Sequence, residues 1–222
     1  MRFSPAEAVQ LSTAVDIAAL DPGKGNTKLE LIESFQTILG REDLSLIVID
    51  VPIGLLDAGE RECDRAARKL IGKRRSSVFP APIRAMLDAE TYEEACQKRY
   101  RVEKKRCSVQ LYSILPAIRD ADNQLTPALQ SRVREGHPEV SFTLLNGGSQ
   151  MRHPKKSPAG RDERLTLLAR QFPDVQERVA RVSKIGAETD AIDAYALLCF
   201  CKRHTPNIKS NVSVLTLISN FS

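Results

Sequence analysis

Apolar residues along the chain form short runs separated by polar or glycine-rich segments. The β-compatible runs AVDIAAL and TKLELI flank the turn sequence DPGKGN, a pattern typical of a β-hairpin. The unbroken apolar run from Leu44 to Ile49 predicts a strand that is buried on both faces. Near the C-terminal end, NVSVLTLISNF alternates polar and apolar residues, which is compatible with a further strand.

Between these strands, helical periodicity is typical of several segments. HPEVSFTLL is interpreted as another strand, with Glu139 at its entry. The expected helices cover Ser34 to Leu39, Ala58 to Ile71, Arg161 to Gln171 and Ala187 to Lys202, with a helical region from Thr91 to Arg134 that is interrupted at Pro116 and Pro127. Strands and helices that follow one another in this way predict the α/β class.

Length and composition add few constraints. With 222 residues and 42% hydrophobic content, the chain is expected to form one domain over residues 1–222. No run approaches the roughly 18 apolar residues of a membrane helix, and MRFSPAEAVQ lacks the features of a signal peptide, so a soluble, cytoplasmic protein without membrane contact is expected. Five scattered cysteines without a CxxC pair indicate reduced thiols, mostly packed in the interior. A net charge of +5 favours an anionic partner, such as nucleic acid or a nucleotide.

Asp50 is the first candidate for chemistry. It directly follows the predicted central strand, and Pro52 and Gly54 end that strand sharply. The carboxyl end of a central strand lies at the edge where open α/β sheets bind ligands. The alternative is an Asp that caps the following turn.

Three further acids are expected at the same edge. Asp190 and Asp193 are three residues apart on a predicted helix, so their carboxylates share one face and repel each other unless a cation lies between them. The alternative for this pair is a solvated helix face. Glu139 follows His137 by two residues, and His137 is interpreted as a structural histidine bonded to backbone rather than as a general base. Together Asp50, Glu139, Asp190 and Asp193 are predicted to hold Mg²⁺ or Mn²⁺.

Two basic segments are candidates for phosphate binding. The loop from Lys155 to Gly160 is the stronger candidate, because a proline and a glycine fix its shape, while the first segment is also compatible with a solvated face. No Walker motif is present, which disfavours phosphoryl transfer from a nucleotide. The basic residues are Lys73, Arg74 and Arg75, beside Ser76 and Ser77, and then Lys155, Lys156 and Arg161.

An ordered series of sequence blocks resembles a known family. The blocks are IDVPIGL, CDRAARKLIGKRRSSVFPAP, HPEVSFTLLNGG, KKSPAGRDERLTLL and DAIDAYALL, over about Leu29 to Lys202. They resemble domain-of-unknown-function family 429, a predicted nuclease family with a ribonuclease H-like fold. The resemblance implies a mixed sheet flanked by helices, with Asp50, Glu139, Asp190 and Asp193 as the metal-binding or catalytic acids.

The chain departs from this family at its N-terminal end. Such proteins open with a strand that carries an Asp, before the strand matched here by AVDIAAL, whereas MRFSPAEAVQLST contains only Glu7. The opening strand is therefore missing or atypical, and its neighbours are expected to be partly unpaired unless residues 1–13 or NVSVLTLISNF cover them. Two functions follow as hypotheses: a metal-dependent nuclease, impaired by the missing Asp, or a non-catalytic module that binds nucleic acid or nucleotides.

Overall fold

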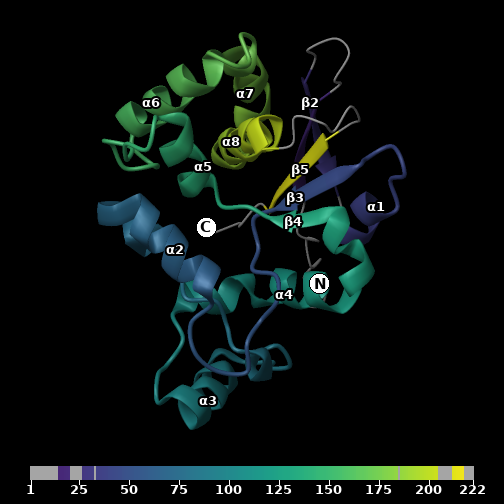
Figure 1. Ribbon diagram of the computed structural model, residues 1–222, viewed down its shortest axis with the longest axis vertical. Helices are drawn as coiled ribbons and strands as arrows, with labels where there is room; N and C mark the ends of the chain where they lie inside the picture. The colour runs from purple at the N-terminus through teal and green to yellow at the C-terminus, as the bar shows by residue number, and fades with distance from the viewer. Residues whose placement is uncertain (1–14, 21–26, 33, 185, 205–211, 218–222) are drawn as a thin grey trace, which may run out of the picture.

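A five-stranded mixed sheet organises the fold (Figure 1). The computed structural model describes residues 15–20, 27–32, 34–184, 186–204 and 212–217. The strand order is β2-β1-β5-β3-β4. The strands are β1 (Val15–Leu20), β2 (Thr27–Ile32), β3 (Leu46–Ile49), β4 (Val133–Glu135) and β5 (Val212–Leu217).

The strand β5 lies at the centre of this sheet. It pairs with β1 in antiparallel and with β3 in parallel orientation, so the predicted strand in the C-terminal segment is confirmed. The predicted hairpin is confirmed as well, since β1 and β2 pair in antiparallel register; its turn and residues 1–13 lie outside the described residues. β5 therefore pairs with the facing edges of β1 and β3.

Helices pack on both faces of the sheet. Along β3 the side chains alternate: Leu46 and Val48 join a core with α5, α6, α7 and α8, whereas Ile47 and Ile49 join a core with α1 and α4. In Figure 1 α3 lies farthest from α6 and α7. The helices are α1 (Phe35–Leu39), α2 (Glu62–Ile71), α3 (Tyr92–Glu103), α4 (Val109–Gln124), α5 (Pro138–Leu145), α6 (Pro158–Ala169), α7 (Val175–Ser183) and α8 (Glu188–His204), with short 3-10 helices η1 (Gly72–Ser77), η2 (Arg84–Met86) and η3 (Pro127–Ser131).

Two predictions of local structure were wrong where they bear on the site. HPEVSFTLL is the helix α5 and not a strand, because Pro138 has the fixed φ that suits a first helical turn and Phe142 packs in the core. The helical region does not extend to Arg134, because Val133–Glu135 form the edge strand β4 beside β3. Strand pairing therefore determines β4, whereas α5 follows from its proline-led first turn and from core packing.

Other helix limits differ from the predicted ones. Pro116 lies inside α4 and does not interrupt it, because the buried face of that helix compensates for the lost backbone hydrogen bond. The helix α2 begins at Glu62, after Gly59 with its positive φ of 89°, and α6 begins at Pro158, where Ser157 caps it. The helix α7 was not predicted.

Two predictions about the whole chain can be compared with the described part. None of its helices is long and apolar enough to cross a membrane. All five cysteines are free thiols, and only Cys63 is exposed, which confirms the interpretation as mostly packed thiols.

Candidate functional site

The fold places Asp50 on the face of the sheet that α5 and α8 cover. Asp50 follows Ile49 directly, so the alternation of the strand directs it to the same side as Leu46 and Val48. The link from β4 to α5 passes very close to this face at Gly136, where a Cβ atom would lie 2.6 Å from Val48 Cγ1 and 2.7 Å from Leu197 Cδ2. Glycine is therefore required for α5 to begin beside the end of β3.

Asp50 and Asp193 approach one ammonium group. Lys155 Nζ donates a hydrogen bond to Asp193 Oδ2, and the Asp193 side chain is only 3% exposed. Burial alone would lower the pKa of Lys155, but Asp193 and, more weakly, Asp50 and Asp190 raise it above its ordinary value. Lys155 therefore carries a stable positive charge, held by Asp193 and favoured by the nearby Asp50 and Asp190.

The carboxyl groups themselves titrate abnormally. Burial raises the pKa of Asp50 to about 6, an effect that Asp193 and Glu135 increase and that His137 and Lys155 oppose. Burial also raises the pKa of Asp193, although the neighbouring Lys155 favours the charged form. Desolvated carboxyl groups that influence each other are characteristic of functional sites, although structural ion pairs have the same effect.

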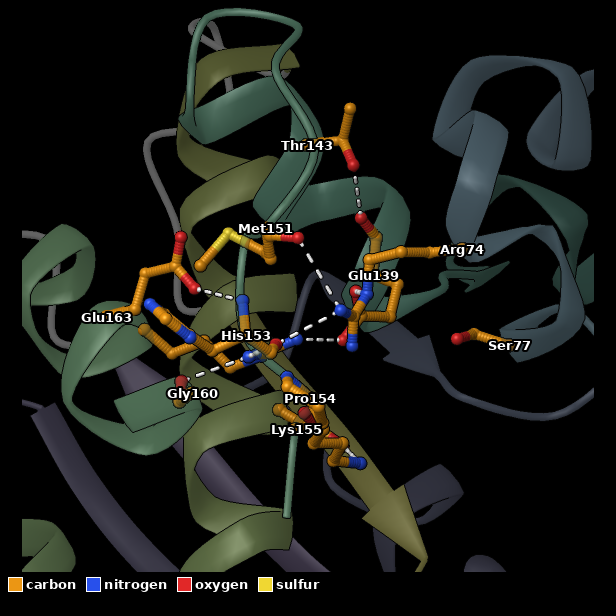
Figure 2. Close-up of polar contacts among 12 residues, drawn as sticks. Arg74, Ser77, Glu139, Thr143, Met151, His153, Pro154, Lys155, Gly160 and Glu163 are labelled. Atoms are coloured by element: carbon orange, nitrogen blue, oxygen red, sulfur yellow. Dashed lines mark hydrogen bonds and ion pairs between the residues drawn. The ribbon is translucent and has the colours of Figure 1, made fainter. Parts of the chain in front are cut away.

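Glu139 is held by two arginines. Arg74 Nε donates to Glu139 Oε2 at 3.0 Å, and Arg164 Nη2 donates to Oε1. Figure 2 shows Arg74 beside Glu139, with Thr143 bonded to the Glu139 carbonyl. The side chains of Arg164 and Glu139 are 1% and 6% exposed. This carboxylate is therefore bound on both oxygens by the protein's own cations.

Arg164 is also fixed from other directions. Its Nη1 donates to the carbonyl oxygens of Gly160 at 3.0 Å and His153 at 3.4 Å, and its guanidinium lies 5.3 Å from the centre of the Phe142 ring. Its Nε is buried and has no hydrogen-bond partner among the described residues. A buried guanidinium in this setting depends on Glu139 for charge compensation.

The four predicted acids are thus partly brought together. Asp50, Asp190 and Asp193 all act on Lys155, and Glu139 acts on Asp193. Within the described part of the chain, however, no three His, Cys, Asp or Glu side chains are grouped so that they could hold a metal ion. We call these four acids and Lys155 the acid centre.

His137 lies next to the acid centre in a structural contact. Its Nε2 lies 3.1 Å from the Ser77 carbonyl oxygen, which confirms the interpretation as a histidine bonded to backbone. Its Nδ1 is buried and has no hydrogen-bond partner among the residues that the structure describes.

A cationic cavity adjoins the acid centre at the N-terminus of α6. It has a volume of about 260 Å³ and is lined by four cationic side chains and one acidic side chain. These are Lys155, Lys156, Arg161, Arg164 and Glu188. We call this cavity the basic pocket.

The shape of the basic pocket depends on close packing of its loop. A Cβ atom on Gly160 would lie 1.9 Å from the Pro154 carbonyl oxygen, and Ser157 Oγ accepts a hydrogen bond from Gly160 N at 3.0 Å. These contacts fix Lys155 and Lys156 over the first turn of α6. The positive end of the helix dipole adds to their charge.

The cations of the pocket differ in what they contact. Arg161 pairs with Glu188 and Asp162, whereas Lys156 is exposed and forms no ion pair with any described residue. The cationic charge of Lys156 is therefore available to a ligand.

The first basic segment reaches the same region from the other side. Arg74 lies in η1 and binds Glu139, while Lys73 and Arg75 are exposed on the same short helix, as is Ser76, and Ser77 is partly buried. Arg74 from η1 and Arg164 from α6 therefore meet at one carboxylate. Of the described residues predicted to bind phosphate, only Arg74 contacts Glu139; Arg164, which binds its other oxygen, was not among them.

The family model described as "Protein of unknown function (DUF429)" matches residues 12–210. The chain belongs to the DUF429 family. That match includes every acid and base of the site, and it extends beyond the region over which the sequence blocks resemble the family. No curated protein and no solved structure was matched.

Several residues that build this DUF429 site were not predicted from the sequence. The sequence does not identify Arg164 as a site residue, because it lies in the leucine-rich helical segment RLTLL and resembles a solvated helix residue. Arg61 and Glu135 were missed too: Arg61 is buried and donates to Glu135, which also accepts a hydrogen bond from Ile53 N at 2.8 Å. These contacts fix the segment that follows Asp50.

Proposed function

We propose that this DUF429 protein binds the phosphate groups of nucleic acid at the basic pocket. The observation that carries the proposal is a cavity at the N-terminus of a twelve-residue helix, lined by four cationic side chains. Helix N-termini and clustered cations are the usual binding groups for phosphate. Lys156 is the residue most available for this contact.

The acid centre has a supporting role in this proposal. Asp193 holds Lys155 and Glu139 holds Arg164, so the carboxylates orient two of the cations that line the pocket. In this arrangement the acids do not contact the phosphate; they fix the positions of the cations that bind it. The net charge of +5 is consistent with an anionic partner of this kind.

The ribonuclease H-like description of the fold also belongs to this proposal. It is supported by a mixed sheet flanked by helices, with acids gathered beyond the end of β3. In this proposal, β5 occupies the central place, between β1 and β3, that the Asp-bearing opening strand takes in the family that the sequence resembles. Its sequence VSVLTL contains no acid, so this strand supplies no carboxylate beside Asp50.

A second candidate is metal-dependent hydrolysis of phosphodiester bonds, with Mg²⁺ or Mn²⁺ as the ion. It is favoured by the convergence of Asp50 and Asp193 on a single positive charge. As arranged, the described acids do not fit such an ion, because Lys155 binds Asp193 and two arginines bind Glu139, and no three acids of the described chain are grouped for a metal.

The binding proposal is tested by fluorescence anisotropy with labelled single-stranded, double-stranded and hybrid oligonucleotides over a series of salt concentrations. Lys156→Ala should weaken binding to all of them about equally and reduce the salt slope by about one, the value for one lost phosphate contact. The matched control is Arg101→Ala, an exposed cation on α3, which should change neither quantity. An unchanged slope in Lys156→Ala would refute the proposal.

The same samples decide between the two candidates. Incubation of each oligonucleotide with Mg²⁺ or Mn²⁺ should leave it intact if the protein only binds. Metal-dependent cleavage that Asp50→Asn abolishes would establish the second candidate instead.

A further inference from the structure

A second cavity lies between the segment that follows Asp50 and the helix α3. Its volume is about 210 Å³, and its walls come from the region around Gly59, from α2, from Pro80–Pro82 and from α3. None of the residues that line it also lines the basic pocket. It is therefore a separate feature of the molecule.

Part of its lining is satisfied within the protein. Arg61 donates to both oxygens of Asp64 and both oxygens of Glu135, and also to the Ile53 carbonyl. These residues form a closed network, which leaves Arg61 without a free donor for a ligand.

Arg99, unlike Arg61, has donors that no described residue accepts. It is 6% exposed, and only its Nε is engaged, by Glu103 Oε2 at 2.8 Å. The other Glu103 oxygen accepts a hydrogen bond from Gly59 N at 2.8 Å. Neither terminal nitrogen of Arg99 has a partner among the described residues. These two nitrogens are not among the fully buried atoms that lack a partner, so they are open to solvent in the cavity that Arg99 lines.

Two further cations have unused donors at this cavity. Arg68 donates from Nε to the Val78 carbonyl and from Nη1 to Glu60, but its Nη2 is buried without a partner in the described part of the chain. Lys105 is exposed and lines the cavity, and the described residues offer it no ion pair. Arg99 and Lys105 therefore offer donors around one space, and Arg68 adds positive charge to its wall.

We propose that this cavity binds a small oxyanion, either a phosphate or a carboxylate group. Guanidinium groups bind the oxygens of both through charge-assisted hydrogen bonds. The side chains of Leu56, Pro80 and Pro82 form an apolar part of the wall, which suits a short carbon chain attached to the anionic group. The site is independent of the nucleic-acid binding proposed for the basic pocket.

The experiment is isothermal titration of the full chain with inorganic phosphate and, separately, with butyrate, in a chloride buffer. At least one of them should bind at this cavity at concentrations up to about 50 mM, and Lys156→Ala, which weakens the basic pocket, should leave that binding in place. Arg99→Met and Lys105→Ala should each weaken that binding about tenfold, the loss of a charge-assisted hydrogen bond or more. Arg101→Gln, an exposed neighbour on α3, is the matched control and should leave the affinity unchanged.

The two variants and the two probes separate the outcomes. Lys105 is exposed, so Lys105→Ala keeps the test valid if Arg99→Met does not fold. Binding of phosphate alone identifies a phosphate ligand, and binding of butyrate alone identifies a carboxylate. The proposal is overturned if neither probe binds, if Lys105→Ala binds as tightly as the wild type, or if Lys156→Ala abolishes binding, which would place the anion in the basic pocket.

Discussion

Glu139→Gln tests whether Glu139 has a structural role. The substitution keeps the shape of the side chain but removes the charge that compensates Arg164, which is 1% exposed, and Arg74, which is 19% exposed. Removing one partner of a buried ion pair destabilises a protein by about 3–5 kcal/mol. Gln retains one acceptor oxygen for Arg164, so the lower end of this range, about 3 kcal/mol, is expected.

The assay is thermal unfolding at neutral pH. For a chain of this length, about 3 kcal/mol corresponds to a fall in Tm of about 6–12 °C. Glu177→Gln is the control, because Glu177 and Arg181 form a pair in which both side chains are about 70% exposed, and it should lower stability by at most about 0.5 kcal/mol. A Tm for Glu139→Gln that equals or exceeds that of the wild type would refute the structural role and favour the role of Glu139 as a ligand kept at the expense of stability.

Three further predictions follow from the same contacts. The pKa of Asp50 is raised from 3.8 to about 6, so its contribution to stability is complete below pH 4 and is lost as the pH rises through 6. Asp50→Asn should therefore be more stable than the wild type above pH 6, by up to about 3 kcal/mol. A stability difference that does not vary with pH in urea titrations would contradict this. Deletion of residues 205–222 removes β5 and leaves β1 and β3 each without a partner on one edge. At about 1 kcal/mol for each lost backbone hydrogen bond, this loss approaches a typical total stability, and a cooperative thermal transition at the wild-type temperature would disprove it. Gly160→Ala should weaken oligonucleotide binding and also lower Tm, since its Cβ would clash with the backbone of Pro154 and displace the loop; unchanged anisotropy would show that the loop geometry does not matter.

The sequence predicted those elements whose local pattern is unambiguous. The apolar run before Asp50 identified β3 and the position of Asp50 at its end, and the turn sequence identified the hairpin. HPEVSFTLL was misassigned because a short apolar run suits a strand and a buried helix equally well. The combination of Pro138 and Glu139 in a first turn was the available signal for a helix.

Local sequence patterns could not predict which residues bind the acids. Lys155 and Asp193 are 38 residues apart, and Glu139 is separated from Arg74 by 65 residues and from Arg164 by 25. Only the packing of α6, α8 and η1 brings them together. For the same reason the alternation in NVSVLTLISNF predicted a strand but not its central place in the sheet.

The central claim is that the protein's own cations, with no divalent ion, bind phosphate beside the acid centre. The most direct measurement compares the affinity for one labelled oligonucleotide in Mg²⁺ and in EDTA at equal ionic strength, with the integrity of the oligonucleotide checked on a gel. The account predicts that binding in EDTA is at least as tight as in Mg²⁺, because Mg²⁺ competes for the phosphates, and that the oligonucleotide stays intact in both conditions. Binding or cleavage that occurs only in the presence of Mg²⁺ would contradict it.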